Sequence, residues 1–394
     1  MPTPFTTTRI LWRMTDSLPL SAIETPAILV DLDRTAVNLD RAATYARTHG
    51  LALRPHVKTH KSTRIAAEQL QRGATGLTCA TPAELEVMSA VSDDLLLAYP
   101  SIGVARTRHL SALPDSVRLT VALDSRRAVE ELARAAGHAG RRIGAYVEID
   151  VGMHRVGLPD VDQAIELARA IRAERGLHFG GVAFYPGQVR ERVDEQDAAL
   201  ALLGDRLSAA IERFGAAGLQ PPVVSGGSTP TLWRTHELAG VTEFRPGTYV
   251  YNDRTTAAIG ACAWEDCALT VLATVVSTAV PGQAVIDAGT KALGREPVRG
   301  APDEGFGALL DRPEVLVVRM SEEHGILDLG ATDWRPSVGD VVRVVPNHVC
   351  IVVHLHDLAY GIRGERVEAS WPIAARGRAQ PAFEEMQERR NAGT

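Results

Sequence analysis

The segment GAYVEIDVGMHRVGLPDVDQAIELARAIRAERGLHFGGVAFYPG (residues 144–187) decides the fold class of this 394-residue chain. It opens with a short apolar run, continues through VDQAIELARAIRAE (161–174) with apolar residues at helical spacing, and ends in a second apolar run (180–186). Two short buried strands joined by an amphipathic helix are typical of a βαβ unit, whose strands are parallel. The segment therefore predicts an α/β protein.

The same alternation extends over about residues 25–250. About eight strand–helix units in some 220 residues match the size of a (β/α)8 TIM-like barrel. Nine strands are expected, so one should lie outside the barrel, and the first is favoured because it follows an irregular tail. A doubly wound open sheet is the competing architecture, which periodicity does not exclude. The expected strands are 27–33, 51–55, 76–80, 94–99, 117–123, 144–150, 180–186, 222–227 and 242–247.

The pattern changes after about residue 265, where β-branched runs such as EVLVVRM, DVVRVVP and CIVVHLH are separated by Gly, Pro and Asp turns. Runs of this kind without long helices predict an antiparallel β domain. The predicted organisation is an N-terminal tail (1–24), a barrel (25–262), a C-terminal β domain (263–380) and a polar tail (381–394).

Composition excludes several classes of protein. The formal net charge is −6 and no Lys/Arg-rich block occurs, which argues against nucleic-acid and anionic-membrane partners. No apolar run approaches the roughly 18–20 residues of a membrane span. The opening stretch lacks the features of a signal peptide, and Met14 is an alternative start. The four cysteines are too scattered for a disulfide framework, so we expect a cytoplasmic protein.

The segment RPHVKTHK (54–61) places Lys58 between His56 and His60, after a strand and before a helix. That is the barrel face at which active sites gather. A lysine there can form an imine with an aldehyde if its pKa is lowered, and the two imidazoles could carry protons near neutral pH. Taken alone, the segment fits a solvated basic loop better.

Two glycine-containing turns follow late strands. VSGGSTPT (224–231) and RPGTYVYND (245–253) can present backbone N–H groups and hydroxyls to a phosphate, and late barrel loops often do so. Each could equally be a tight turn without a ligand. The candidate phosphate-binding residues are Gly226, Gly227, Ser228, Thr229, Gly247 and Thr248.

Two further strand ends carry candidate side chains. Arg155, in DVGMHRVG, could hold a phenolate or carboxylate oxygen, although a surface arginine needs no such role. Tyr185, in FYPGQ, could stack on a ring or hydrogen-bond to it.

PNHVC (346–350) is the candidate metal site. If the segment is a strand, His348 and Cys350 share a face and could bind a divalent ion together, with His354 and His356 at the same period. Imidazole with thiolate favours Zn²⁺ over Mg²⁺ or Ca²⁺. A buried Cys beside a half-buried His is the alternative without a metal.

RPHVKTHK, CATPAELE, DVGMHRVG, FYPGQ, VSGGSTPT, RPGTYVYND, DAGTKAL, SEEHG and PNHVC occur in this order between about residues 25 and 378. Together they resemble the D-threonine aldolase and D-serine dehydratase family of fold-type III pyridoxal-5′-phosphate (PLP) enzymes, which is related to alanine racemase. The resemblance implies a PLP-binding barrel, a C-terminal β domain and a homodimer with active sites near the interface.

The resemblance also implies roles for the candidate residues. Lys58 matches the family's Schiff-base lysine, Arg155 the arginine at the cofactor's phenolic oxygen, and Tyr185 a tyrosine beside the ring. The two glycine turns match the phosphate-binding turns. His348 and Cys350 match the metal pair of the dehydratase branch, whereas the aldolase branch more often has His-x-Asp. Two residues depart from the pattern, Gln188 in place of His and His354 in place of Asn.

The function expected from this resemblance is a lyase that depends on PLP and a divalent metal, with zinc favoured and manganese or magnesium as alternatives. It would dehydrate a D-serine- or D-threonine-like substrate to a 2-keto acid and ammonia. Lys58 would remove the Cα proton. The alternative is retro-aldol cleavage to glycine and an aldehyde, with His60 as the base. An amino-acid racemase and a non-enzymatic PLP-binding protein remain further alternatives.

Overall fold

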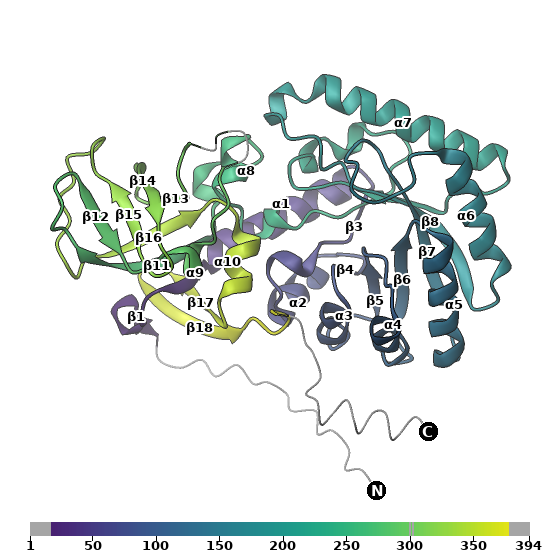
Figure 1. Ribbon diagram of the computed structural model, residues 1–394, viewed down its shortest axis with the longest axis horizontal. Coiled ribbons are helices and arrows are strands. Elements are labelled where there is room, and N and C mark those ends of the chain that lie inside the picture. The colour runs from purple at the N-terminus through teal and green to yellow at the C-terminus, as the bar shows by residue number, and fades with distance from the viewer. Residues whose placement is uncertain (1–16, 299–300, 302, 378–394) are drawn as a thin grey trace, which may run out of the picture.

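A computed structural model of the chain describes residues 17–298, 301 and 303–377. It contains an eight-stranded parallel sheet with its helices and a ten-stranded, largely antiparallel sheet beside it (Figure 1). Most of the predicted N-terminal tail and all of the predicted polar tail (381–394) lie outside the described residues. Within the described ranges, no helix is both long and apolar enough to cross a membrane.

The eight-stranded sheet forms the predicted barrel. Every pairing in it is parallel, and a bridge between His56 and Thr78, with the Thr78 N–H donating to the Pro55 carbonyl at 2.9 Å, joins its two end strands. The (β/α)8 prediction is therefore confirmed. The order is β3 (Ala52–Leu53), β10 (Glu243–Phe244), β9 (Val223–Gly226), β8 (Leu177–Phe184), β7 (Ile143–Ile149), β6 (Arg118–Leu123), β5 (Asp94–Leu97) and β4 (Leu77–Cys79).

The helices cover the outside of the barrel, as α5, α6 and α7 show in Figure 1. Several begin at side-chain caps: Ser62, Thr81, Ser125 and Asp160 each accept a backbone N–H of the first turn, which satisfies a donor that has no helical partner. The helices are α1 (Leu32–Thr48), α2 (Thr63–Gln71), α3 (Pro82–Met88), α4 (Val104–Ser111), α5 (Arg126–Ala139), α6 (Val161–Ala173), α7 (Asp197–Ala216) and the short α8 (Arg254–Ala258).

The second sheet confirms the antiparallel β domain. All its pairings are antiparallel except β2 with β17. Its strands are β1 (Leu18–Pro19), β2 (Ala27–Asp31), β11 (Leu269–Ser277), β12 (Gln283–Ile286), β13 (Gly307–Leu309), β14 (Arg312–Met320), β15 (Gly325–Asp328), β16 (Val341–Pro346), β17 (Leu358–Arg363) and β18 (Arg366–Pro372). Two short helices, α9 (Thr290–Leu293) and α10 (Val349–Leu355), accompany them.

Three local predictions have clear outcomes. The first predicted strand does lie outside the barrel, because β2 pairs with β11 and β17. Residues 18–19, expected in a tail, pair with β18. The run CIVVHLH was wrongly predicted as a strand and is mostly the helix α10, which buries Val349, Val352 and Val353 at helical spacing. A seven-residue apolar run fits either structure, so burial on one helical face decided the outcome.

Candidate active site

Lys58 lies in a short 3₁₀ helix, η2 (Val57–Thr59), at the end of β3. His56 begins this turn, and its ring Nδ1 accepts the Lys58 backbone N–H at 3.4 Å. The Lys58 ammonium lies 5.9 Å from the centre of the Tyr185 ring, and the Arg155 guanidinium lies 4.6 Å from the same centre. The ends of β3, β7 and β8 therefore bring these three side chains together.

A cavity of about 120 Å³ lies at this end of the barrel. Most of the residues predicted from sequence line it, although they come from both domains. His60 and Gly226 are the two predicted residues that do not. The predicted residues that line the cavity are Lys58, Arg155, Tyr185, Gly227, Ser228, Thr229, Gly247, Thr248, His348 and Cys350.

The first glycine turn is held by its own hydroxyls. Gly227 has a φ of +89°, a conformation that favours glycine. The Ser228 and Thr231 hydroxyls are 3.1 Å apart, and Thr229 Oγ1 accepts the Tyr249 backbone N–H at 3.2 Å. Gly226 lies behind the turn, where a Cβ would collide with the Phe184 ring.

The second glycine turn meets η2. A Cβ on Gly247 would lie 2.8 Å from Thr59 Oγ1 and 3.3 Å from both His56 Cβ and the His56 carbonyl oxygen. Glycine therefore lets this turn approach the segment that carries Lys58. Backbone turns and hydroxyls on one side of the cavity, with a lysine and an aromatic ring near them, suit an anionic, aromatic aldehyde such as PLP.

His60 faces away from this cavity. Its Nδ1 accepts the Ser62 N–H at 3.1 Å, its Nε2 pairs with Gln69 Oε1 at 3.2 Å, and burial lowers its pKa to about 3. The geometry gives no support to the prediction that His60 carries a proton. His56 lines the cavity instead, and burial, followed by the charge of Lys58, holds its pKa well below the ordinary value.

Three charged residues of the cavity were not singled out from sequence: Asp253, which caps α8, and the strand-end residues Arg245 and Glu148. Arg245 is buried and donates to Ser225 Oγ at 2.6 Å and to the Phe184 carbonyl at 3.0 Å. Glu148 lies nearby; burial raises its pKa, although Arg245 and Arg155 oppose the shift. Their strand-end positions, in the quoted RPGTYVYND and EIDVGMHRVG, were the available signal.

His348 and Cys350 face the same cavity, but the strand argument for their pairing was wrong. His348 is the N-cap of α10 and Cys350 lies in the first turn. Residues two apart in an α-helix point in different directions, since successive residues turn by about 100°. The extended backbone of His348, with φ −148° and ψ 103°, is what lets its ring turn toward Cys350.

The electrostatics of this pair favour a thiolate. Burial alone would raise the Cys350 pKa, but His348 and Lys58 outweigh it and lower the pKa to about 7. Burial would lower the His348 pKa, but Cys350 and Asp253 raise it to about 11. Cys350 Sγ also lies 3.2 Å from Thr59 Oγ1. A thiolate and an imidazole suit a borderline-soft metal ion.

The described residues contain no group of three or more His, Cys, Asp or Glu side chains arranged to hold a metal. A metal held by His348 and Cys350 would have two protein ligands. Such a site leaves positions for water and substrate, as catalytic metal sites do.

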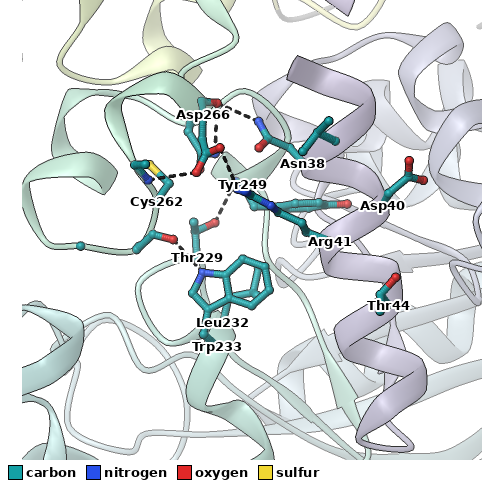
Figure 2. A pocket seen from close by; sticks show the side chains of 15 residues that line it. Asn38, Asp40, Arg41, Thr44, Thr229, Leu232, Trp233, Tyr249, Cys262 and Asp266 are labelled. Carbon is teal, nitrogen blue, oxygen red and sulfur yellow. Dashed lines mark hydrogen bonds and ion pairs between the residues drawn. The ribbon is translucent and has the colours of Figure 1, made fainter. Parts of the chain in front are cut away.

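A larger cavity of about 710 Å³ adjoins the first and shares Thr229 with it. Figure 2 shows Asn38 and Arg41 on one side of it and Trp233 on the other. Its polar groups bond mainly to one another: Arg41 pairs with the Asp266 carboxylate at 2.7 Å, and the Trp233 indole donates to the Ala261 carbonyl at 2.7 Å. We therefore place the chemistry in the smaller cavity.

Comparisons with known proteins identify the family of the chain. Residues 30–255 match the family model for the alanine racemase N-terminal domain, and residues 268–362 match that for a putative serine dehydratase domain. A D-threo-3-hydroxyaspartate dehydratase from Delftia sp. (strain HT23) is 36% identical over 84% of this chain and 92% of its own length. The chain belongs to the D-threonine aldolase and D-serine dehydratase family. This family consists of PLP-dependent lyases of fold-type III, as the sequence predicted.

Other members of the family are similarly close. A D-threonine aldolase from Arthrobacter sp. is 31% identical over 91% of this chain and 94% of its own length. The crystal structure of a D-threonine aldolase from Filomicrobium marinum superposes with a TM-score of 0.84 at 33% identity, covering 92% of this chain and 98% of the other. A mutant of a D-threo-3-hydroxyaspartate dehydratase is known in a metal-free form. Alanine racemase from Bacillus anthracis, 15% identical with a TM-score of 0.66, shares the fold.

Proposed function

We propose that this family member is a PLP- and divalent-metal-dependent lyase that dehydrates a D-β-hydroxy amino acid to a 2-keto acid and ammonia. The observation that carries the proposal is the His348–Cys350 pair facing the same cavity as Lys58. The dehydratase relative at 36% identity supports this choice of reaction, as does the cysteine in the His-x-Cys segment.

The cavity residues fit the cofactor. Lys58 would hold it covalently, the turns at Gly227–Thr229 and Gly247–Thr248 would bind its phosphate, and Tyr185 would lie beside its ring. The bound cofactor supplies an electron-accepting ring that stabilises negative charge at the substrate Cα. Arg155, over the Tyr185 ring, would bind the cofactor's phenolic oxygen.

Lys58 is also the residue that we assign to proton removal at Cα, because its amine lines the cavity in which the substrate would bind. His348 and Cys350 would hold the metal, with zinc favoured by the thiolate and manganese or magnesium as alternatives. The bound metal supplies a Lewis acid for the substrate β-hydroxyl. Both residues are half-buried and line the same cavity as Lys58.

Retro-aldol cleavage to glycine and an aldehyde is the second candidate. The relatives favour it almost as strongly, since the Arthrobacter D-threonine aldolase aligns over 91% of this chain. A metal bound near the β-hydroxyl serves both reactions, because either requires charge stabilisation at that oxygen. The family resemblance also supports a cytoplasmic location and a homodimer. Light scattering on the purified protein would check the homodimer.

Product analysis with D-serine, D-threonine and D-3-hydroxyaspartate tests the proposal. We expect ammonia and a 2-keto acid in equal amounts from the preferred substrate. Glycine and an aldehyde would instead assign the aldolase reaction. Appearance of the L-enantiomer without either product pair would assign a racemase, and no turnover by PLP-loaded, metal-loaded protein would favour a binding protein.

A further inference from the structure

Asp253 links the end of the barrel to the metal-binding segment. It is fully buried at the N-cap of α8, and its Oδ1 accepts the Thr256 N–H at 2.8 Å and the Thr256 hydroxyl at 2.9 Å. Its Oδ2 lies 3.2 Å from His348 Nδ1 and accepts the Val349 N–H at 3.2 Å. Both carboxylate oxygens therefore have two partners.

We propose that Asp253 is a positioning residue that directs His348 to bind the metal through Nε2. The inference rests on the proposed function, because it needs His348 to be a metal ligand. A carboxylate can only accept, so its contact with Nδ1 requires the ring proton on that atom. When a metal displaces the ring's other proton, the lone pair that it takes is the one on Nε2, and the hydrogen bond at Nδ1 makes that nitrogen more basic.

Asp253 also fixes the direction of Cys350. Its bond to the Val349 N–H occupies a free donor of the first turn of α10, the turn that contains Cys350. One carboxylate oxygen thus holds the imidazole and the backbone of the thiol in one arrangement. This accounts for a shared direction that helical periodicity alone does not provide.

The two residues after Asp253 strengthen the same junction. Arg254 donates to Asn347 Oδ1 at 3.3 Å, and the Thr255 hydroxyl donates to the Asn347 carbonyl at 2.8 Å. Asn347 is buried and directly precedes His348. Residues 253–255 of the barrel therefore hold residues 347–349 of the β domain in register, which makes the position of His348 depend on Asp253.

The competing interpretation is that Asp253 only caps α8. Its capping box with Thr256 would explain its burial without any role toward the metal. The two interpretations differ for Thr256→Val, which removes the hydroxyl from the box but leaves the bonds of Oδ2 to His348 and Val349. Capping alone predicts the same result for Thr256→Val and Asp253→Asn, whereas positioning predicts a metal defect mainly in Asp253→Asn.

The test measures zinc affinity of the PLP-loaded protein by competition with a chromogenic chelator. Asp253→Asn has a single acceptor oxygen and cannot serve both pairs of donors, so we expect zinc to bind about 10- to 100-fold more weakly. Thr256→Val should bind zinc as the wild type does. In a His348→Ala background, Asp253→Asn should cause a much smaller loss, since only the bond to the Val349 N–H is then affected.

Thermal unfolding with chelator and the absorbance of the bound cofactor show whether each variant still folds. Zinc affinity of Asp253→Asn equal to that of the wild type would overturn the inference, as would an equal loss in Thr256→Val. A crystal structure of the zinc-loaded wild type gives a reading that needs no variant: zinc on His348 Nε2 supports the inference and zinc on Nδ1 refutes it. A wild type that binds no zinc would overturn the proposed metal site itself.

Discussion

Gly247→Ala tests whether the close approach of the second glycine turn to η2 positions Lys58. The new Cβ would lie 2.8 Å from Thr59 Oγ1, closer than side-chain Cβ atoms approach other atoms, and 3.3 Å from two atoms of His56. Gly247 has a φ of −123°, so no strain arises from φ itself. The effect therefore comes from overlap with η2.

The overlap can relax in two ways, each with a cost. If Thr59 rotates, its 3.2 Å contact with Cys350 Sγ is lost, at about 0.5–1.5 kcal/mol for one hydrogen bond. If η2 moves instead, Lys58 moves with it by a few tenths of an ångström. Overpacking of this kind destabilises by about 1–3 kcal/mol. Displacement of a catalytic group by less than 1 Å should lower kcat by roughly tenfold.

Chemical denaturation of the cofactor-free protein measures the loss of stability. Steady-state kinetics with saturating PLP and zinc measure the loss of kcat. Gly137→Ala is the matched control, because its Cβ meets nothing within 4 Å and it lies in the last turn of α5, outside the cavity. It should stabilise the protein by about 0.5–1 kcal/mol without changing kcat. Wild-type stability and kcat in Gly247→Ala would refute the argument from close approach.

Four other predictions follow from the site. Lys58→Ala should lose the visible cofactor band and several orders of magnitude in activity, and borohydride reduction should label Lys58; a label on Lys61 or Lys291 would contradict the assignment. Chelation or Cys350→Ala should abolish turnover with the cofactor band retained, and zinc should restore only the chelated wild type; full activity without metal would contradict this. D-serine should be turned over in preference to L-serine, and equal rates would count against the proposed reaction. Lys61→Met should destabilise the fold by about 3–5 kcal/mol in denaturation, because it leaves the buried Glu84 carboxylate without its partner.

The barrel could be predicted because its strands are buried on both faces and therefore read as short apolar runs between helices. All eight barrel strands fall within predicted runs or within a few residues of them. Much of the site was predictable for a related reason: parallel strands end at one face, so residues that follow them converge. The same logic failed for α10, where Val-rich sequence suits either a strand or a helix.

The sequence predicted that His60 would face the cavity, but His56 does so instead, which shows what residue spacing leaves out. Both flank Lys58 by two residues, and the spacing treats them alike. The 3₁₀ turn at 57–59 and the left-handed Lys61, with a φ of 48°, send the His60 ring into the core against Gln69. The hydrogen bonds of the His60 ring with Gln69 and Ser62 keep it out of the cavity, and the spacing around Lys58 gives no sign of them.

The β domain contributes two residues of the proposed site, His348 and Cys350, that the barrel alone does not contain. In the proposed site the barrel supplies Lys58 and the phosphate turns, which would hold the cofactor, and Asp253, which would position His348. Helix α10 brings Cys350 against Thr59, the neighbour of Lys58, and the charge of Lys58 helps lower the pKa of the Cys350 thiol. The contacts of Thr59 with Cys350 and of Asp253 with His348 both join the barrel to the β domain, so in the proposed site the two domains would act as one unit.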